Sequence, residues 1–132
     1  MDMPRPVDKL FRTVFLGCDD NVMYPRPQNK QTKNFLIHFH GTYLPLQGIP
    51  FIVKAAKILE REDIEFNLIG DLRTYGEAID LAAHLGLKNI NFINYLPYDK
   101  LAEQMAMADV CLGIFGDNEK ATRAGAFKVI EA

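Results

Sequence analysis

The feature that most constrains the fold is a repeated succession of a short apolar run, a loop with glycine, and a segment of helical periodicity. The first instance begins with the apolar run 35–40, continues through Gly41 and Gly48, and reaches Pro50. Proline suits the first turn of a helix, because it has no N–H group to leave unpaired there. Apolar residues then recur at helical spacing up to Leu59. This stretch therefore predicts a strand, a loop and a helix.

The next stretch repeats the pattern. The apolar run 66–70 predicts a second strand that ends in Gly70. Thr74 and Glu77 have the spacing of a capping box, which predicts the start of a second helix. Gly86 follows the last apolar residue of the helical pattern and predicts the end of that helix.

Two more strands are expected further along the chain. The run 90–93 predicts a short third strand, and Asp99 predicts the N-cap of a third helix. The run Val110–Phe115 is almost wholly apolar, which predicts a fourth strand in the centre of the sheet. The pattern at 127–132 is that of the first turn of a further helix.

Strands that alternate with helices indicate an α/β protein with a parallel sheet and right-handed crossovers. The predicted fold class is a Rossmann-like, doubly wound parallel sheet over residues 35–132, which would bind ligands outside the carboxyl ends of its strands. Residues 1–34 differ, because they hold four of the seven prolines, a wholly polar run at 28–34 and one apolar run at 13–17. They predict an interdomain or linker segment with one short strand.

Composition excludes several classes of function. The chain has 132 residues and a net charge of −2, which gives no electrostatic basis for binding nucleic acid. Cys18 and Cys111 lie far apart with no Cys/His cluster, so they are expected to be free thiols, and no metal site is predicted. The sequence shows neither a membrane-length apolar run nor the apolar core of a signal peptide. A cytoplasmic protein is expected.

Five segments occur in the order and with the spacing seen in the group 1 (family 4) glycosyltransferases. These segments are Gly41–Gly48, Phe66–Gly70, Asn89–Ile93, Ala108–Gly113 and Lys128–Ala132. The chain resembles the nucleotide-sugar-binding C-terminal half of the two-domain GT-B fold in this family, and the resemblance covers residues 35–132. It implies an incomplete donor-binding domain, which should continue beyond residue 132, and a missing N-terminal acceptor domain.

The resemblance also implies an activity. The parent enzyme would be hexosyltransferase-like and would transfer a sugar from a nucleoside diphosphate sugar to a glycan or lipid-linked acceptor, as in polysaccharide biosynthesis. It would retain the anomeric configuration and use neither a metal nor another cofactor. Transfer takes place between the two domains of such enzymes, so the isolated chain is expected to be inactive, and its catalytic residues stay unassigned. Peripheral membrane association of the parent enzyme is a further implication.

The donor-binding candidates implied by the resemblance lie in the loops that follow the predicted strands and near the end of the chain. They are Gly41, Thr42, Gln47, Gly48, Gly70, Tyr95, Leu96, Phe115, Gly116, Lys120, Lys128 and Glu131. Taken singly, the glycines are also compatible with tight turns and helix caps.

Two of these positions depart from the family pattern. Negative charge grows on the diphosphate leaving group during transfer, and fixed donors stabilise that charge. The family usually places an Arg after the first-strand glycine and a Lys before the next glycine, where this chain has Thr42 and Gln47. Both are neutral donors, and charge-assisted hydrogen bonds are roughly twice as strong as neutral ones. Candidate cationic replacements are Lys120, Arg123 and Lys128.

Glu131 matches the second Glu of the E-x7-E motif of the family, whose carboxylate accepts hydrogen bonds from the ribose hydroxyls. The first Glu of that motif is replaced by Arg123, so the motif is not intact. A simpler interpretation of Lys128 and Glu131 is an ion pair between residues three apart on a helix. His38 and His40 alternate along one strand face and are expected at the core or the rim of the crevice rather than at a metal.

Two other functions stay open. A nucleotide-sugar epimerase shares the two-domain layout, since fold alone does not fix function. The other is a non-catalytic doubly wound binding module, such as a receiver-like domain, although the acidic cluster typical of receivers is not evident. An incomplete domain would also leave apolar surface uncovered, which predicts self-association of the fragment.

Overall fold

The computed structural model of the protein describes residues 10, 12, 14, 17–27, 33–60, 63–123 and 131–132. The strands are β1 (Phe35–His40), β2 (Ile64–Gly70), β3 (Ile90–Asn94) and β4 (Val110–Cys111). The helices are α1 (Ile49–Ile58), α2 (Gly76–His84), α3 (Tyr98–Met107) and the short α4 (Glu119–Arg123). Two 3-10 turns, η1 (Pro45–Gln47) and η2 (Leu72–Thr74), precede α1 and α2.

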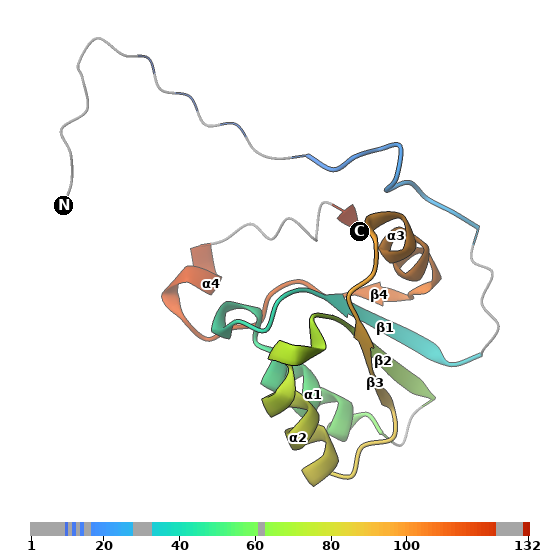
Figure 1. The fold of residues 1–132 in the computed structure, drawn as a ribbon, viewed down its shortest axis with the longest axis vertical. Helices are drawn as coiled ribbons and strands as arrows, with labels where there is room; N and C mark the ends of the chain where they lie inside the picture. Colours follow the sequence, from blue (N-terminus) through green and yellow to red (C-terminus); the bar gives the residue numbers. More distant parts are fainter. Residues whose placement is uncertain are drawn as a thin grey trace.

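The four strands form one parallel sheet in the order β3-β2-β1-β4. The pairing of β1 with β2 runs from Phe35 opposite Ile64 to His40 opposite Ile69. Figure 1 shows α1 and α2 together on one side of this sheet and α3 on the other. The predicted α/β, doubly wound parallel architecture is therefore confirmed.

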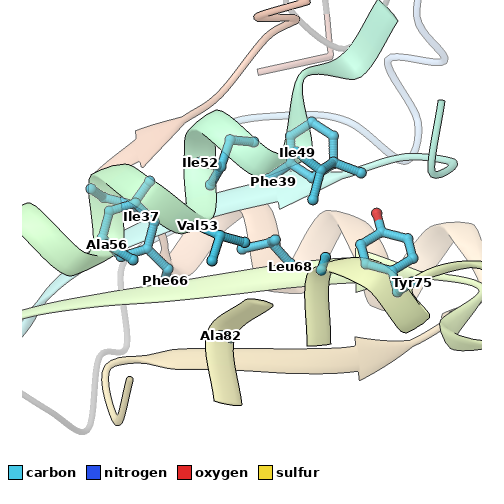
Figure 2. Close-up of a cluster of buried hydrophobic side chains, with 11 residues drawn as sticks. Ile37, Phe39, Ile49, Ile52, Val53, Ala56, Phe66, Leu68, Tyr75 and Ala82 are labelled. Atoms are coloured by element: carbon cyan, nitrogen blue, oxygen red, sulfur yellow. The ribbon is translucent and has the colours of Figure 1, made fainter. Parts of the chain in front are cut away.

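The main core lies between the sheet and the α1–α2 layer. Side chains alternate along a strand, so Ile37 and Phe39 of β1 face this layer while His38 faces α3. Figure 2 shows β1 and β2 side chains packed against α1, with Tyr75 at one end of the cluster. The buried members are Ile37, Phe39, Ile49, Ile52, Val53, Ala56, Phe66, Leu68, Tyr75, Ala78 and Ala82.

A smaller cluster lies around α3. Met23, from the segment that precedes β1, packs with Ala102 and Met105 of α3, and Cys111 of β4 lies against this group. Cys18 and Cys111 are free thiols. Part of the predicted linker segment is thus packed against the domain, although the division of the chain at residue 34 stays a prediction.

The predicted central position of the fourth strand is wrong. β4 has only two residues and lies at an edge of the sheet. The Leu112 N–H still donates to the His38 carbonyl, but the chain then leaves the sheet, because the next backbone donors bond to η1 instead. Asp109 precedes β4, and its carboxylate accepts from the Leu36 N–H while its own N–H donates to the Leu36 carbonyl.

Two predicted helix caps are also wrong. The Thr74 hydroxyl donates to the Asp71 carbonyl within η2, so α2 begins at Gly76 without a side-chain cap. Asp99 lies in the first turn of α3, and the N-cap position is occupied by Pro97. The η2 turn precedes the start of α2, and the extended Pro97 precedes the start of α3.

Some predicted features fall outside the described residues. Thr13, Phe15 and Leu16 of the predicted first short strand are among these, and so is the stretch 127–130 of the predicted last helix. Among the helices that the structure describes, none is long and apolar enough to cross a bilayer.

The contrast between two aliphatic side chains tests the core. Leu68 is fully buried between the sheet and the helices, whereas Ile58 at the end of α1 is 81% exposed. Leu68→Ala should lower the free energy of unfolding by about 2–5 kcal/mol, because it leaves a cavity in a packed interior. Ile58→Ala should change it by less than about 0.5 kcal/mol. Urea denaturation measures both, and equal losses would contradict the assigned core.

Candidate functional site

The candidate site lies where the direction of chain progression across the sheet reverses. From β1 the chain moves outward to β2 and β3, and it then returns to place β4 on the other side of β1. In open α/β sheets, ligands bind at such a switch point, outside the carboxyl ends of the strands. The expected crevice at β1 and β4 is bordered by residues 41–48 and 112–117.

The two bordering loops are joined by backbone hydrogen bonds. The Phe115 N–H donates to the Gln47 carbonyl at 3.1 Å, and the Gly116 N–H donates to the Leu46 carbonyl at 3.0 Å. An added Cβ on Gly116 would lie 2.4 Å from the Pro45 carbonyl oxygen. This glycine is therefore needed for close approach of the two backbones.

Gly48 serves two purposes at this junction. Its φ of 68° is in the left-handed region, and it ends η1 and begins α1. A Cβ at this position would also lie 2.3 Å from the carbonyl carbon of Phe115. The structure thus brings the predicted residues Gly48, Phe115 and Gly116 together, and the two glycines pack the loops.

Three further candidates lie on the β1 side of the crevice. Gln47 is half-buried, and its side chain lies over Gly41, since an added Cβ on that glycine would be 3.5 Å from Gln47 Oε1. Thr42 is exposed beside them. Gly70, at the carboxyl end of β2, underlies Gly41, because its added Cβ would be 2.4 Å from the Gly41 oxygen.

Tyr75 is a residue at this edge that sequence reasoning missed. It is fully buried, and its hydroxyl donates a 2.7 Å hydrogen bond to the Gly41 carbonyl. Burial raises the pKa of Tyr75, so the hydroxyl keeps the proton that it donates. A single aromatic residue in a turn has no periodic pattern, and only the three-dimensional contact reveals its partner 34 positions away.

A second cluster consists of polar side chains and connects the sheet with the end of the described chain. His38 Nε2 lies 2.9 Å from His40 Nδ1, and His40 Nε2 lies 3.2 Å from Glu131 Oε2. The Tyr98 hydroxyl donates to Glu131 Oε1 at 2.8 Å. Burial, with the Glu131 carboxylate beside it, raises the pKa of Tyr98 to about 12. Glu131 therefore joins the carboxyl end of β1 to the start of α3.

This arrangement bears on the predicted role of Glu131. Its side chain is only 5% exposed, and both carboxylate oxygens accept hydrogen bonds from protein groups. Each oxygen keeps a second lone pair, so a ribose hydroxyl requires an approach past His40 or Tyr98. The ribose-binding role of Glu131 stays a prediction. His40 and Tyr98 are partners that the sequence motif does not name.

The remaining candidates lie further away or outside the described residues. Tyr95 is largely exposed and Leu96 half-buried after β3, two strand spacings (about 10 Å) from β1. Lys120 and Arg123 are exposed on α4, which packs beside η1 (Figure 1), and Arg123 pairs with Glu119. Lys128 falls in the part of the chain that is not described.

Metal ligands and apolar surface are two further features that bear on binding. The described part of the chain holds no group of three His, Cys, Asp or Glu side chains that could bind a metal ion. An apolar groove of about 260 Å³ lies along α1 beside β1. Its lining residues are Ile37, Phe51, Ile52, Ala55, Leu59, Phe66, Leu112 and Phe115.

Close approach of the two loops can be tested with a pair of glycine substitutions. Gly48→Ala introduces a Cβ into the Phe115 backbone at a left-handed φ and should cost at least about 2 kcal/mol of unfolding free energy. Gly76→Ala at the start of α2 is the control, because no heavy atom lies within 4 Å of its added Cβ. It should change stability by less than about 1 kcal/mol. Similar effects of both substitutions in urea denaturation would contradict the packed junction.

The buried His38 predicts a specific acid sensitivity. Its side chain is 1% exposed, and burial, with a smaller contribution from His40, lowers its pKa from 6.5 to about 3. Between these two values the unfolded chain binds the proton more readily, so unfolding becomes easier as the pH falls from about 6.5 toward 3. The contribution of one such group is at most about 1.4 kcal/mol per pH unit.

Denaturation of the wild type, His38→Gln and Ile58→Ala over this pH range measures that contribution. The pH slope should be smaller in His38→Gln and unchanged in Ile58→Ala, since Ile58 has no titratable group and is 81% exposed. An unchanged pH slope in His38→Gln would contradict a buried, neutral His38.

The fold of this sheet is similar to that of several solved proteins. HepE from Anabaena in complex with UDP-glucose superposes with a TM-score of 0.63 and 18% identity over 76% of this chain. Its complex with UDP and glucose gives a TM-score of 0.61 over the same share, also at 18% identity. WaaG, a glycosyltransferase involved in lipopolysaccharide biosynthesis, gives 0.55 with 20% identity over 70% of this chain. The chain spans 30% of the length of HepE and 26% of WaaG.

Comparison by sequence identifies the family. A search of the curated proteins found no significant match. The family described as "Glycosyl transferases group 1" matches residues 23–112, which is well over half of the chain and includes all four strands. The chain therefore belongs to the group 1 glycosyl transferases.

Proposed function

We propose that the chain binds the diphosphate of a nucleoside diphosphate sugar in the crevice at the carboxyl ends of β1 and β4. The observation that carries this proposal is the switch point of the sheet, where residues 41–48 and 112–117 converge. The backbones at this point are fixed by hydrogen bonds and by glycines that allow close contact. A rigid set of donors at such a place stabilises a charge that grows during the reaction.

The donors available to the diphosphate are mostly neutral. Thr42 and Gln47 supply side-chain groups, and the N-terminus of α1 points its partial positive charge toward the same edge. Lys120 adds a full positive charge from α4, which packs beside η1. Arg123 is a weaker candidate, because Glu119 already compensates its charge. Glu131 would contact the ribose, and Tyr95 and Leu96 the base.

The donor that we propose first is a UDP-sugar, because HepE was crystallised with UDP-glucose. The parent enzyme would transfer a hexose to a glycan or lipid-linked acceptor with retention of configuration and without a metal ion. A separate acceptor domain would complete the cleft, so this chain alone would not catalyse transfer. The parent protein would work in the cytoplasm, at the membrane surface when its acceptor is a lipid.

We propose in addition that the chain self-associates. The apolar groove along α1 exposes Phe51 and Phe115, each to a little under half of its surface. Aromatic surface of this kind is stabilised when a second surface covers it.

Titration of the 132-residue chain with UDP, GDP and ADP tests donor binding. One diphosphate should raise the melting temperature, and at a free concentration of 100 times Kd it should add about 2.7 kcal/mol to the free energy of unfolding. Lys120→Ala should weaken that binding about tenfold, because it removes a charge near the diphosphate. Lys88→Ala, at the amino end of β3, is the matched control and should have no effect.

Two results count against the proposal. One is the absence of stabilisation by all three diphosphates. The other is an equal loss of affinity in Lys120→Ala and Lys88→Ala, which would indicate unspecific attraction between charges.

A further inference from the structure

We propose that Tyr75 is a positioning residue for the donor site, and that it orients the peptide between Gly41 and Thr42 so that the Thr42 N–H donates to the diphosphate. This inference rests on the proposed function, because it assigns a specific backbone donor to the diphosphate. It concerns a residue that lies on neither of the two loops that border the crevice.

Both backbone polar groups of Gly41 have fixed partners. Its N–H donates to the Ile69 carbonyl at 3.0 Å, which extends the β1–β2 ladder by one residue. Its carbonyl accepts the 2.7 Å hydrogen bond from the Tyr75 hydroxyl. The first residue of the loop is therefore held from two directions before the chain turns into the crevice.

Because the Gly41 carbonyl is fixed, peptide geometry also fixes the direction of the Thr42 N–H. The described chain has no cis peptide bond, and the C=O and N–H of a planar trans peptide point in opposite directions. Because the Gly41 oxygen points toward Tyr75 in the α1–α2 core, the Thr42 N–H points away from that core. No backbone acceptor for the Thr42 N–H is found within the described ranges, and Thr42 is exposed.

The Tyr75 hydroxyl has little freedom to move. The ring packs edge-on against Tyr43 at a centroid distance of 5.7 Å and against Phe92 at 6.3 Å. Gly70 closes the remaining side, because an added Cβ there would be 2.9 Å from the tyrosine ring and hydroxyl. Figure 2 shows the Tyr75 side chain at the end of the core cluster, beyond Leu68 and Ile49. The buried aromatic cluster thus determines where the Gly41 carbonyl sits.

Tyr43 offers a matched control within the same cluster. Its ring contacts Tyr75, but its hydroxyl donates to the Glu77 carboxylate on the surface of α2 and not to the loop. Tyr75→Phe and Tyr43→Phe each remove one hydroxyl and one hydrogen bond and keep both rings. Only the first substitution releases the Gly41 carbonyl.

The experiment measures binding of the diphosphate that stabilises the wild-type chain, with UDP as the first probe, and of the corresponding nucleoside. Tyr75→Phe should weaken diphosphate binding at least fivefold and leave nucleoside binding unchanged. Tyr43→Phe should bind both ligands as the wild type does. In ¹H–¹⁵N spectra of the wild type, the Thr42 amide should shift on addition of the diphosphate and not on addition of the nucleoside.

The outcomes separate this inference from the function on which it rests. If the wild type binds a diphosphate but the Thr42 amide does not shift, the inference is overturned whatever the variants do. Equal affinity of Tyr75→Phe and wild type, or equal weakening of nucleoside and diphosphate, also overturns it and leaves the donor site intact. If the wild type binds no diphosphate, both proposals fail.

Discussion

The parallel pairing of β1 with both β2 and β4 is the constraint on which the rest of the structure depends. β1 is paired with β2 over its whole length and with β4 over two residues, so its central residues are buried and its carboxyl end is fixed. The chain proceeds from β1 to β2 on one side and returns to place β4 on the other, and ligands of open α/β sheets bind at such a switch point. The loop from Gly41 to Gly48 starts at this fixed point, and every proposed contact to the diphosphate follows from its position.

Backbone contacts, more than side chains, shape the crevice. Gly48 and Gly116 allow the loops after β1 and β4 to bond directly, and Gly70 allows the Gly41 carbonyl to lie against β2. The proposed donor site would rely on such backbone groups beside Thr42 and Gln47, because oriented N–H groups contribute to an electropositive environment without a full charge. The polar chain from His38 to Glu131 lies on the α3 side and ties the end of the described chain to the same strand.

Much of the fold could be predicted because buried parallel strands are continuous apolar runs that end in turn residues, and β1 has the bounds that were expected. The short β4 could not be predicted, because its continuation is decided by hydrogen bonds to η1, nearly seventy residues earlier. The helix start at Gly76 depended on the η2 turn, and the start at Tyr98 on the extended Pro97, and neither follows the capping pattern. In the site, glycines were identifiable because close contact demands them, whereas Tyr75, His40 and Tyr98 act through partners distant in sequence.

Asp109 affects how well the register of β4 against β1 is defined. A strand of two residues has too few ladder bonds to define its alignment, and a slip by one residue would turn every side chain to the opposite face. Asp109 forms two hydrogen bonds to Leu36: its carboxylate accepts from the Leu36 N–H, and its own N–H donates to the Leu36 carbonyl. A strand shifted by one residue would lose both hydrogen bonds, including the charge-assisted one. The single acidic side chain next to the strand therefore fixes a register that two strand residues cannot fix by themselves.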